Sequence, residues 1–84
     1  MRIRQESLLW RKVDDEGVVL DLEASLYLRA NRSAAELWEL LAEDRTEAEL
    51  AAFLQERYGI APERAESDVQ AFVAALRARG VLDE

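Results

Sequence analysis

The side chains that could take part in catalysis here are carboxylates, serines and one lysine, because the chain contains neither histidine nor cysteine. Histidine is the commonest general base and metal ligand, and cysteine would supply thiolate nucleophiles and disulfides. The densest group of carboxylates is Asp14-Asp15-Glu16, which is followed by Gly17. Its spacing matches no calcium-binding loop, so we interpret it as a solvated turn in which Gly17 takes a positive φ.

The other candidate nucleophiles lack the neighbours that would activate them. Ser25 and Ser33 are explained as a turn residue and a helix cap, and Lys12 at a strand end would be solvated rather than desolvated, as Schiff-base chemistry requires. An acyl carrier would resemble its relatives in having Asp-Ser-Leu at a helix start, but Ala24 precedes Ser25 and Arg32 precedes Ser33. We therefore expect no enzyme activity, no cofactor and no metal ion.

Length and charge limit the remaining classes of protein. The chain has 84 residues and a formal charge of −7, and half of its residues are apolar. We expect one domain over residues 1–84, without a membrane span or a secretion signal, in the cytoplasm. Residues 13–84 carry seven arginines against seventeen carboxylates. Such a surface repels phosphate, so nucleic acid is not an expected partner, and a peptide with some basic character matches the total charge better.

The residues that could bind a partner must be positioned by an α+β fold. Residues 7–29 have the pattern of three short antiparallel strands, at about 7–13, 18–22 and 26–29, joined by turns at 14–17 and 23–25. Alternation places Val18, Leu20 and Leu22 on one face of the second strand. In the third strand, Leu26 and Leu28 point to one face and Tyr27 and Arg29 to the other. One face of such a sheet must be covered by helices.

Residues of about 32–80 have the pattern of three helices. Asn31 or Ser33 caps the first, and Ser33 would do so in a capping box with Glu36. A second capping box, Thr46 to Glu49, opens the next helix, which ends at Gly59. Pro62 begins the third helix, Gly80 ends it, and Val81-Leu82 can fold back onto the core. The apolar stripe of the first helix consists of Ala34, Leu37, Trp38 and Leu41. That of the third helix consists of Ala65, Val69, Phe72, Val73 and Leu76.

The third strand could be a binding edge. It contains no proline, and its one charge, Arg29, lies at its end. If it lies at the edge of the sheet, its unpaired backbone groups could accept an extended peptide as a further strand. The third helix could line a groove beside it, with Asp68 and Phe72 on one flank and Val73 on the other. A purely structural role for Phe72 in the core remains the alternative.

The order of several motifs resembles the family of the PQQ synthesis protein D, whose members are also called RiPP recognition elements. The similarity begins with Val18-Val19-Leu20-Asp21 and Leu26-Tyr27-Leu28 and continues through Asn31, Ala34-Ala35 and Leu37-Trp38-Glu39-Leu40-Leu41. It then includes Thr46-Glu47-Ala48-Glu49-Leu50, Asp68-Val69, Phe72-Val73, Leu76 and Arg79-Gly80-Val81-Leu82. Ala30 departs from the leucine that the family usually has before the asparagine.

This resemblance implies a winged-helix-like fold of three strands and three helices that binds the leader of a ribosomally made precursor peptide. The leader would add antiparallel to the third strand, in the cleft with the third helix, without any bond chemistry. A free-standing copy of this size looks most like the recognition proteins of lasso peptide biosynthesis, which serve a separate leader peptidase and an ATP-dependent cyclase. The residues implied are Leu26, Tyr27, Leu28, Arg29, Asp68, Val69, Phe72, Val73 and Leu76.

Three alternatives stay open at this point. The first is a winged-helix DNA-binding protein, although the expected second helix carries Glu47, Glu49 and Glu56 against Arg57 alone. The second is a peptide chaperone of the PQQ type. The third is a structural subunit whose edge strand pairs with a second copy of the chain.

Overall fold

The computed structural model describes residues 1–4, 6, 8–22 and 26–84. Ser7, the expected start of the first strand, and the expected connection at 23–25 lie outside the described residues. The elements are, in chain order, β1 (Arg2–Ile3), β2 (Leu8–Val13), β3 (Glu16–Asp21), β4 (Leu26–Ala30), α1 (Arg32–Leu40), α2 (Glu47–Tyr58), α3 (Pro62–Ala78) and β5 (Leu82–Asp83).

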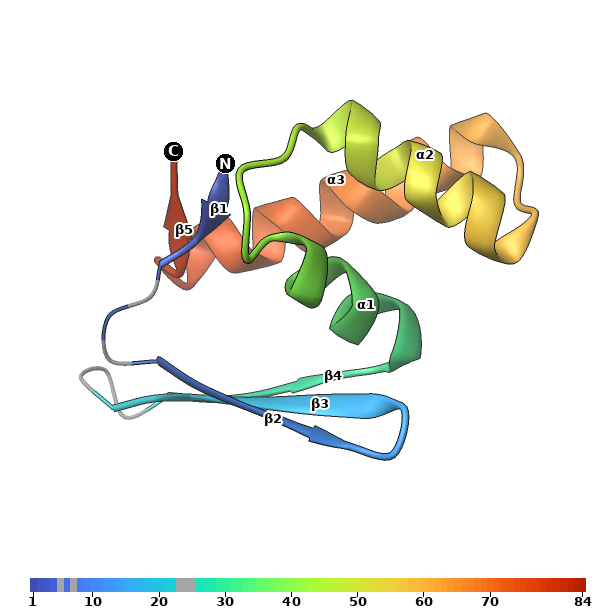
Figure 1. Ribbon diagram of the computed structural model, residues 1–84. Coiled ribbons are helices and arrows are strands. Elements are labelled where there is room, and N and C mark those ends of the chain that lie inside the picture. Colours follow the sequence, from blue (N-terminus) through green and yellow to red (C-terminus); the bar gives the residue numbers. More distant parts are fainter. Residues whose placement is uncertain (5, 7, 23–25) are drawn as a thin grey trace.

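The arrangement confirms the predicted α+β class, with a three-stranded antiparallel sheet of order β2-β3-β4 followed by three helices. Figure 1 shows all three helices on the same side of this sheet. The short strands β1 and β5 were not predicted. They pair antiparallel, with Arg2 opposite Asp83, and bring the two ends of the chain together. Two residues show no readable alternation, so only the distant partner reveals such a strand.

The hairpin between β2 and β3 differs from the sequence prediction. Asp14, not Gly17, has the positive φ, at 56°. Gly17 lies within β3, where a Cβ atom would stand 1.8 Å from the Cη2 atom of Trp10. The Trp10 ring in turn stacks on Trp38 of α1, with ring centroids 5.4 Å apart. Gly17 is therefore required for space rather than for backbone freedom, because the indole that joins the sheet to α1 lies against it.

In β3, the face that the helices cover is less apolar than the uncovered face. Val19 and Asp21 of β3 are buried, whereas Leu20 and Leu22 are exposed. Leu20 stands between Leu9 of β2 and Tyr27 of β4 in the strand register, and these three side chains form a row on the uncovered face. The predicted shared face of Val18, Leu20 and Leu22 is thus the outer one.

The core lies between the helices and the inner face of the sheet. Leu37 and Trp38 of α1 and Leu41 directly after it are buried as predicted. Ala34 is half-buried, and Ala35 is buried instead. In the described residues, the core also contains Ile3, Val19, Leu50, Ala51, Leu54, Ala65, Val69, Val73, Leu76 and Val81. The predicted folding back of Val81 onto the core is confirmed.

The N-terminus of α1 is capped by Asn31 rather than by Ser33. The Asn31 Oδ1 atom accepts hydrogen bonds from the Ala34 N–H at 3.0 Å and from the Ser33 hydroxyl at 3.2 Å. The alternative capping box with Ser33 is wrong, because the carboxylate of Glu36 instead binds Arg57 and Tyr58. The second predicted capping box is present. The Thr46 Oγ1 atom accepts a hydrogen bond from the backbone N–H of Glu49, and the Glu49 Oε1 atom accepts one from the backbone N–H of Thr46.

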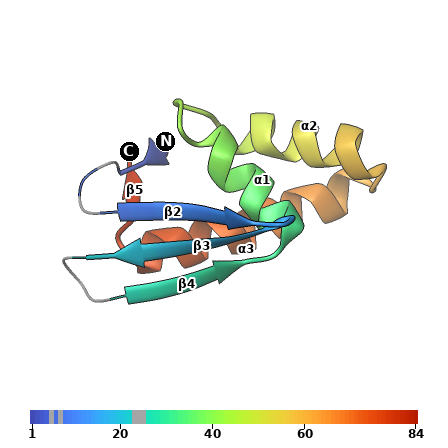
Figure 2. The same cartoon turned by 60° about the horizontal axis from the view of Figure 1, so that its bottom comes forward.

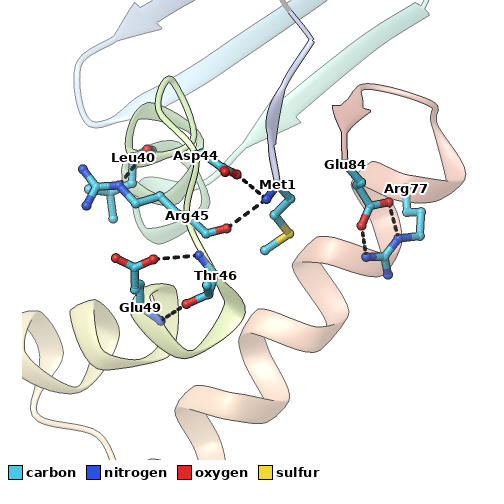
Figure 3. A network of polar contacts seen from close by, with 8 residues as sticks. All are labelled: Met1, Leu40, Asp44, Arg45, Thr46, Glu49, Arg77 and Glu84. Carbon is cyan, nitrogen blue, oxygen red and sulfur yellow. Dashed lines mark hydrogen bonds and ion pairs between the residues drawn. The ribbon is translucent and has the colours of Figure 1, made fainter.

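Polar contacts hold the α1–α2 connection against the N-terminus (Figure 3). The Met1 amine donates to the Asp44 Oδ1 atom at 2.5 Å and to the Arg45 carbonyl oxygen at 3.2 Å. This amine lowers the pKa of the Asp44 carboxyl, first through the hydrogen bond and then through its charge. At the other end of the chain, Arg77 forms a two-atom ion pair with Glu84. These contacts keep the capping box of α2 next to the β1–β5 pair.

One buried ion pair connects the parts of the fold. Asp21 is 3% exposed, and its Oδ2 atom accepts a hydrogen bond from the Arg4 Nη2 atom at 2.8 Å. Arg4 also donates to the carbonyl oxygens of Glu6 and Gly80. The same guanidinium group therefore contacts β3, the segment before β2 and the end of α3.

Candidate functional site

The strand β4 forms one edge of the three-stranded sheet. In the part of the chain that the structure describes, its backbone pairs with β3 alone. The opposite edge, β2, carries two adjacent basic residues, Arg11 and Lys12, and β4 carries only Arg29. Charged side chains discourage strand pairing, so β4 is the edge with fewer obstacles to an added strand. We call this feature the open edge of β4.

The side chains of β4 alternate as the sequence predicts. Tyr27 is 56% exposed, and Arg29 is exposed with its Nη2 atom 3.7 Å from the Glu16 Oε1 atom. Leu28 points to the other face, where it is half-buried and packs against the core. A strand added at this edge would therefore place alternate side chains next to Tyr27 and Arg29 outside, and next to Leu28 inside.

A groove lies where β4 leads into α1. It consists of two adjoining cavities of about 440 and 460 Å³, which lie among the start of α1, the C-terminal half of α2 and residues 64–72 of α3. Figure 2 shows α3 running behind β3 and β4, on the side of the sheet that the helices cover. We call this feature the α1–α3 groove. Its lining residues are Asn31, Arg32, Ser33, Ala34, Leu37, Leu54, Tyr58, Ile60, Arg64, Asp68, Ala71 and Phe72.

The structure separates the two flanks of α3. Asp68 and Phe72 line the α1–α3 groove together, and Phe72 is half-buried against the core. On the other flank, Glu66 and Gln70 line a cavity shared with α2. The flank that carries Asp68 and Phe72 is therefore the one that opens toward the end of β4.

Three of the predicted contact residues have little exposed surface. Val69 and Val73 are each 1% exposed, and Leu76 is 6% exposed. All three belong to the hydrophobic core cluster, so their side chains contact the protein's own interior. They support the helix that presents Asp68 and Phe72 rather than lining the α1–α3 groove themselves.

Sequence reasoning missed most of the groove. Arg32, Tyr58, Ile60 and Arg64 come from the start of α1, the end of α2, the α2–α3 connection and the first turn of α3, and they meet only in three dimensions. A signal was available for Ile60, since an apolar residue directly after the cap Gly59 commonly packs back onto its helix. The two arginines carried no such signal, because isolated charges on helices are usually solvated.

The wall of the groove near α2 is fixed by a polar cluster. Glu36 accepts hydrogen bonds from the Tyr58 hydroxyl and from the Arg57 Nε atom, the latter at 3.0 Å. The bond from Tyr58 lowers the pKa of Glu36, and the same bond raises the pKa of Tyr58. The bond to Glu36 also raises the pKa of Arg57. These contacts connect the C-terminal end of α2 to α1.

The arrangement gives no support to DNA binding by α2. Its acidic residues outnumber its one basic residue, Arg57, and that residue is paired with Glu36. Among the described residues, no group of three carboxylates is placed to hold a metal ion. None of the described helices is both long and apolar enough to cross a lipid bilayer.

Comparisons with known proteins agree on the fold. One solved structure, described as TbiB1 in complex with the TbiA(beta) leader peptide, is 25% identical and has a TM-score of 0.87, covering 99% of this chain and 95% of that one. Another, described as lasso peptide synthetase B1 complexed with the leader peptide, is 29% identical and has a TM-score of 0.81, covering 95% and 93%. No curated protein sequence matches the chain.

The family comparison extends over most of the sequence. The model of the family described as coenzyme PQQ synthesis protein D, or PqqD, matches residues 16–82. The matched segment runs from the first residue of β3 to the first residue of β5, so it includes the open edge of β4 and the whole α1–α3 groove. The chain therefore belongs to the PqqD family.

Proposed function

We propose that this protein is a non-catalytic recognition protein that binds the leader segment of a ribosomally synthesised precursor peptide. The leader adds as an antiparallel strand to the open edge of β4 and continues along the α1–α3 groove. The observation that carries the proposal is an edge strand that, in the described part of the chain, pairs on one side only, next to a groove with a half-buried phenylalanine. Both similar solved structures are described as complexes with a leader peptide, which supports the same role here.

The proposed contacts follow from the positions of the side chains. Backbone groups of residues 26–29 bind the leader, which gives affinity with little dependence on leader sequence. Tyr27 and Arg29 contact its outward side chains, and Leu28 contacts an inward one. Phe72 and Asp68 contact the leader within the groove, while Val69, Val73 and Leu76 hold α3 in place. The domain occupies residues 1–84 in this proposal.

The proposed consequence of binding is delivery of the precursor to other enzymes. Holding the leader raises the effective concentration of the precursor near a leader peptidase and an ATP-dependent cyclase. The similarity to a lasso peptide synthetase B1 supports lasso peptide biosynthesis as the setting. The compartment that we propose for this step is the cytoplasm. The protein itself forms and breaks no bond and needs no cofactor.

A titration tests leader binding directly. We expect the fluorescein-labelled leader of a short precursor encoded next to this gene to raise its anisotropy with a Kd between about 1 nM and 1 μM. A scrambled leader of the same composition should bind far more weakly, and a labelled DNA duplex should not bind. Flat titrations of the leader up to high micromolar protein would contradict the proposal, and tight binding of the duplex would favour a DNA-binding protein.

Hydrogen exchange tests the place of binding. Saturating leader should slow amide exchange in β4, because strand addition engages its edge backbone groups, and should leave β2 unchanged. Sedimentation of the free protein provides the control for self-pairing. Slowed exchange in β2 alone, or a dimer that the leader leaves intact, would place the contact elsewhere.

A further inference from the structure

The charge of the α1–α3 groove differs from the charge of the whole molecule. The chain has a formal charge of −7, but the groove is lined by two arginines, Arg32 and Arg64, and by one carboxylate, Asp68. The total charge favours a basic peptide, whereas the local charge favours an acidic one. Since the charges nearest to a bound peptide act on it most strongly and distant surface charges are screened by salt, the residues that line the groove decide the preference.

Arg32, unlike Arg64, has no carboxylate of its own within ion-pair distance among the described residues. It is the first residue of α1, it is exposed, and within the described part of the chain its guanidinium forms no hydrogen bond or ion pair. The nearest carboxylate along the helix, Glu36, is already engaged by Tyr58 and Arg57. A guanidinium in this position offers a fork of N–H donors to an incoming carboxylate.

Arg64 is held only weakly by its own partner. Its Nε atom is 3.8 Å from the Asp68 Oδ2 atom, and the two side chains are 72% and 52% exposed. Exposed pairs of this kind, one helical turn apart, contribute well under about 1 kcal/mol. A ligand carboxylate could therefore replace Asp68 as the partner of Arg64 at little cost.

The direction of β4 decides which part of a bound peptide meets these arginines. The strand runs from Leu26 to Ala30 and leads directly into Asn31, which lines the groove. In an antiparallel peptide, the residues opposite Ala30 precede those opposite Leu26. The groove therefore receives the peptide segment on the N-terminal side of the added strand.

We infer that the α1–α3 groove selects peptides with an Asp or Glu residue just before the segment that pairs with β4, and that Arg32 and Arg64 bind this carboxylate. The inference rests on the proposed function. The apolar floor of the groove, formed by Leu54 and Ile60, accepts the aliphatic part of the same segment. Arg32 and Arg64 are thus the specificity-determining residues of the site.

A selection from random peptides tests this inference and requires no leader sequence. Yeast cells displaying random peptides long enough to span β4 and the groove are sorted with the labelled wild-type protein and, separately, with the Arg32→Gln/Arg64→Gln variant. We expect Asp and Glu to be enriched before an alternating apolar segment in the wild-type selection only. The acidic peptides should then bind the variant about tenfold more weakly, with a smaller dependence on salt.

Controls separate this result from a general effect of charge. Arg79→Gln removes an exposed arginine after the last turn of α3, far along that helix from Arg64, and should retain the acidic preference. The single Arg32→Gln variant repeats the test with one exposed side chain changed, and circular dichroism verifies that each variant is folded.

The outcomes distinguish the two proposals. Selected peptides without acidic enrichment, or an enrichment that the double variant retains, would overturn the inference and leave leader binding intact. Failure of the wild-type protein to select any peptide, together with a flat titration of the neighbouring leader, would overturn both.

Discussion

At the scale of residues, side-chain volume accounts for two positions, Gly17 in the sheet and Phe72 in the groove. Gly17 leaves the space that the Trp10 ring occupies, and this ring stacks on Trp38 to join the sheet to α1. In the groove, the one large apolar side chain that α3 contributes to the described lining is Phe72, which is half-buried. The residue type at each of these two positions, Gly17 and Phe72, sets how closely the neighbouring groups can approach.

We expect Gly17→Ala to lower the free energy of unfolding by about 1–3 kcal/mol, because the new methyl group would overlap the Trp10 ring. Urea denaturation measures the change. The matched test is the same substitution in a Trp10→Leu background, where the smaller side chain leaves room and the additional cost of Gly17→Ala should nearly vanish. An equal cost in both backgrounds would mean that overlap with the Trp10 ring is not its cause.

We expect Phe72→Ala to weaken leader binding by about 1–3 kcal/mol, as removal of an apolar anchor does. Fluorescence anisotropy gives the affinity, and thermal unfolding shows how much stability is lost. Phe53→Ala is the matched control, because Phe53 is also half-buried and packed against the core but lies on α2, outside the groove. Equal losses of affinity in the two variants would mean that Phe72 acts only through folding.

At the scale of elements, the sequence predicts the type and order of the long segments and fails where distant groups compete. The capping box of Thr46 and Glu49 was predictable because both partners are local. The box of Ser33 and Glu36 has the same pattern but does not form, because Arg57 and Tyr58 bind Glu36 from another helix. The inner face of β3 could not be predicted for a related reason. Its buried Asp21 is paired with Arg4, which lies far away in the sequence.

The contact between α1 and α2 should depend on pH through Glu36. Its folded pKa is lowered, chiefly by the Tyr58 hydrogen bond, so the stabilisation is present above the ordinary glutamate pKa of about 4.5 and is lost as the pH falls through the folded value. We expect Glu36→Gln to destabilise the protein by about 1 kcal/mol at pH 7, and by less below about pH 4. Chemical denaturation at both pH values measures this difference, and a pH-independent cost would contradict it.

At the scale of the whole molecule, one side chain connects several parts of the fold. The guanidinium of Arg4 contacts β3, Glu6 and the end of α3, and it pairs with the buried carboxylate of Asp21. When one member of a buried ion pair is removed, the other charge stays buried with less to balance it. The loss in free energy of unfolding is then larger than the net contribution of the intact pair. The relative placement of the β1–β5 pair and the main sheet therefore depends on this contact.

We expect Arg4→Ala to lower the free energy of unfolding by about 3–5 kcal/mol, enough to unfold much of a domain this small. Arg2→Ala provides the comparison, since Arg2 is an arginine of the same N-terminal segment but is exposed. Calorimetry of both variants measures the difference. If Arg4→Ala lowers the free energy of unfolding no more than Arg2→Ala does, the other contacts of Asp21 are enough to stabilise its buried carboxylate.

The antiparallel pairing of β1 with β5 also has a practical consequence. Because Arg2 stands opposite Asp83, a short synthetic connector could join the two termini, and the backbone could be reopened at the tight turn of Asp14 and Asp15. Such a circularly permuted chain would carry its new ends at the tip of the β2–β3 hairpin. Because Gly17 pairs with Ala30, a reporter attached there would stand beside the end of β4 that leads into the α1–α3 groove, where it could respond to a bound peptide.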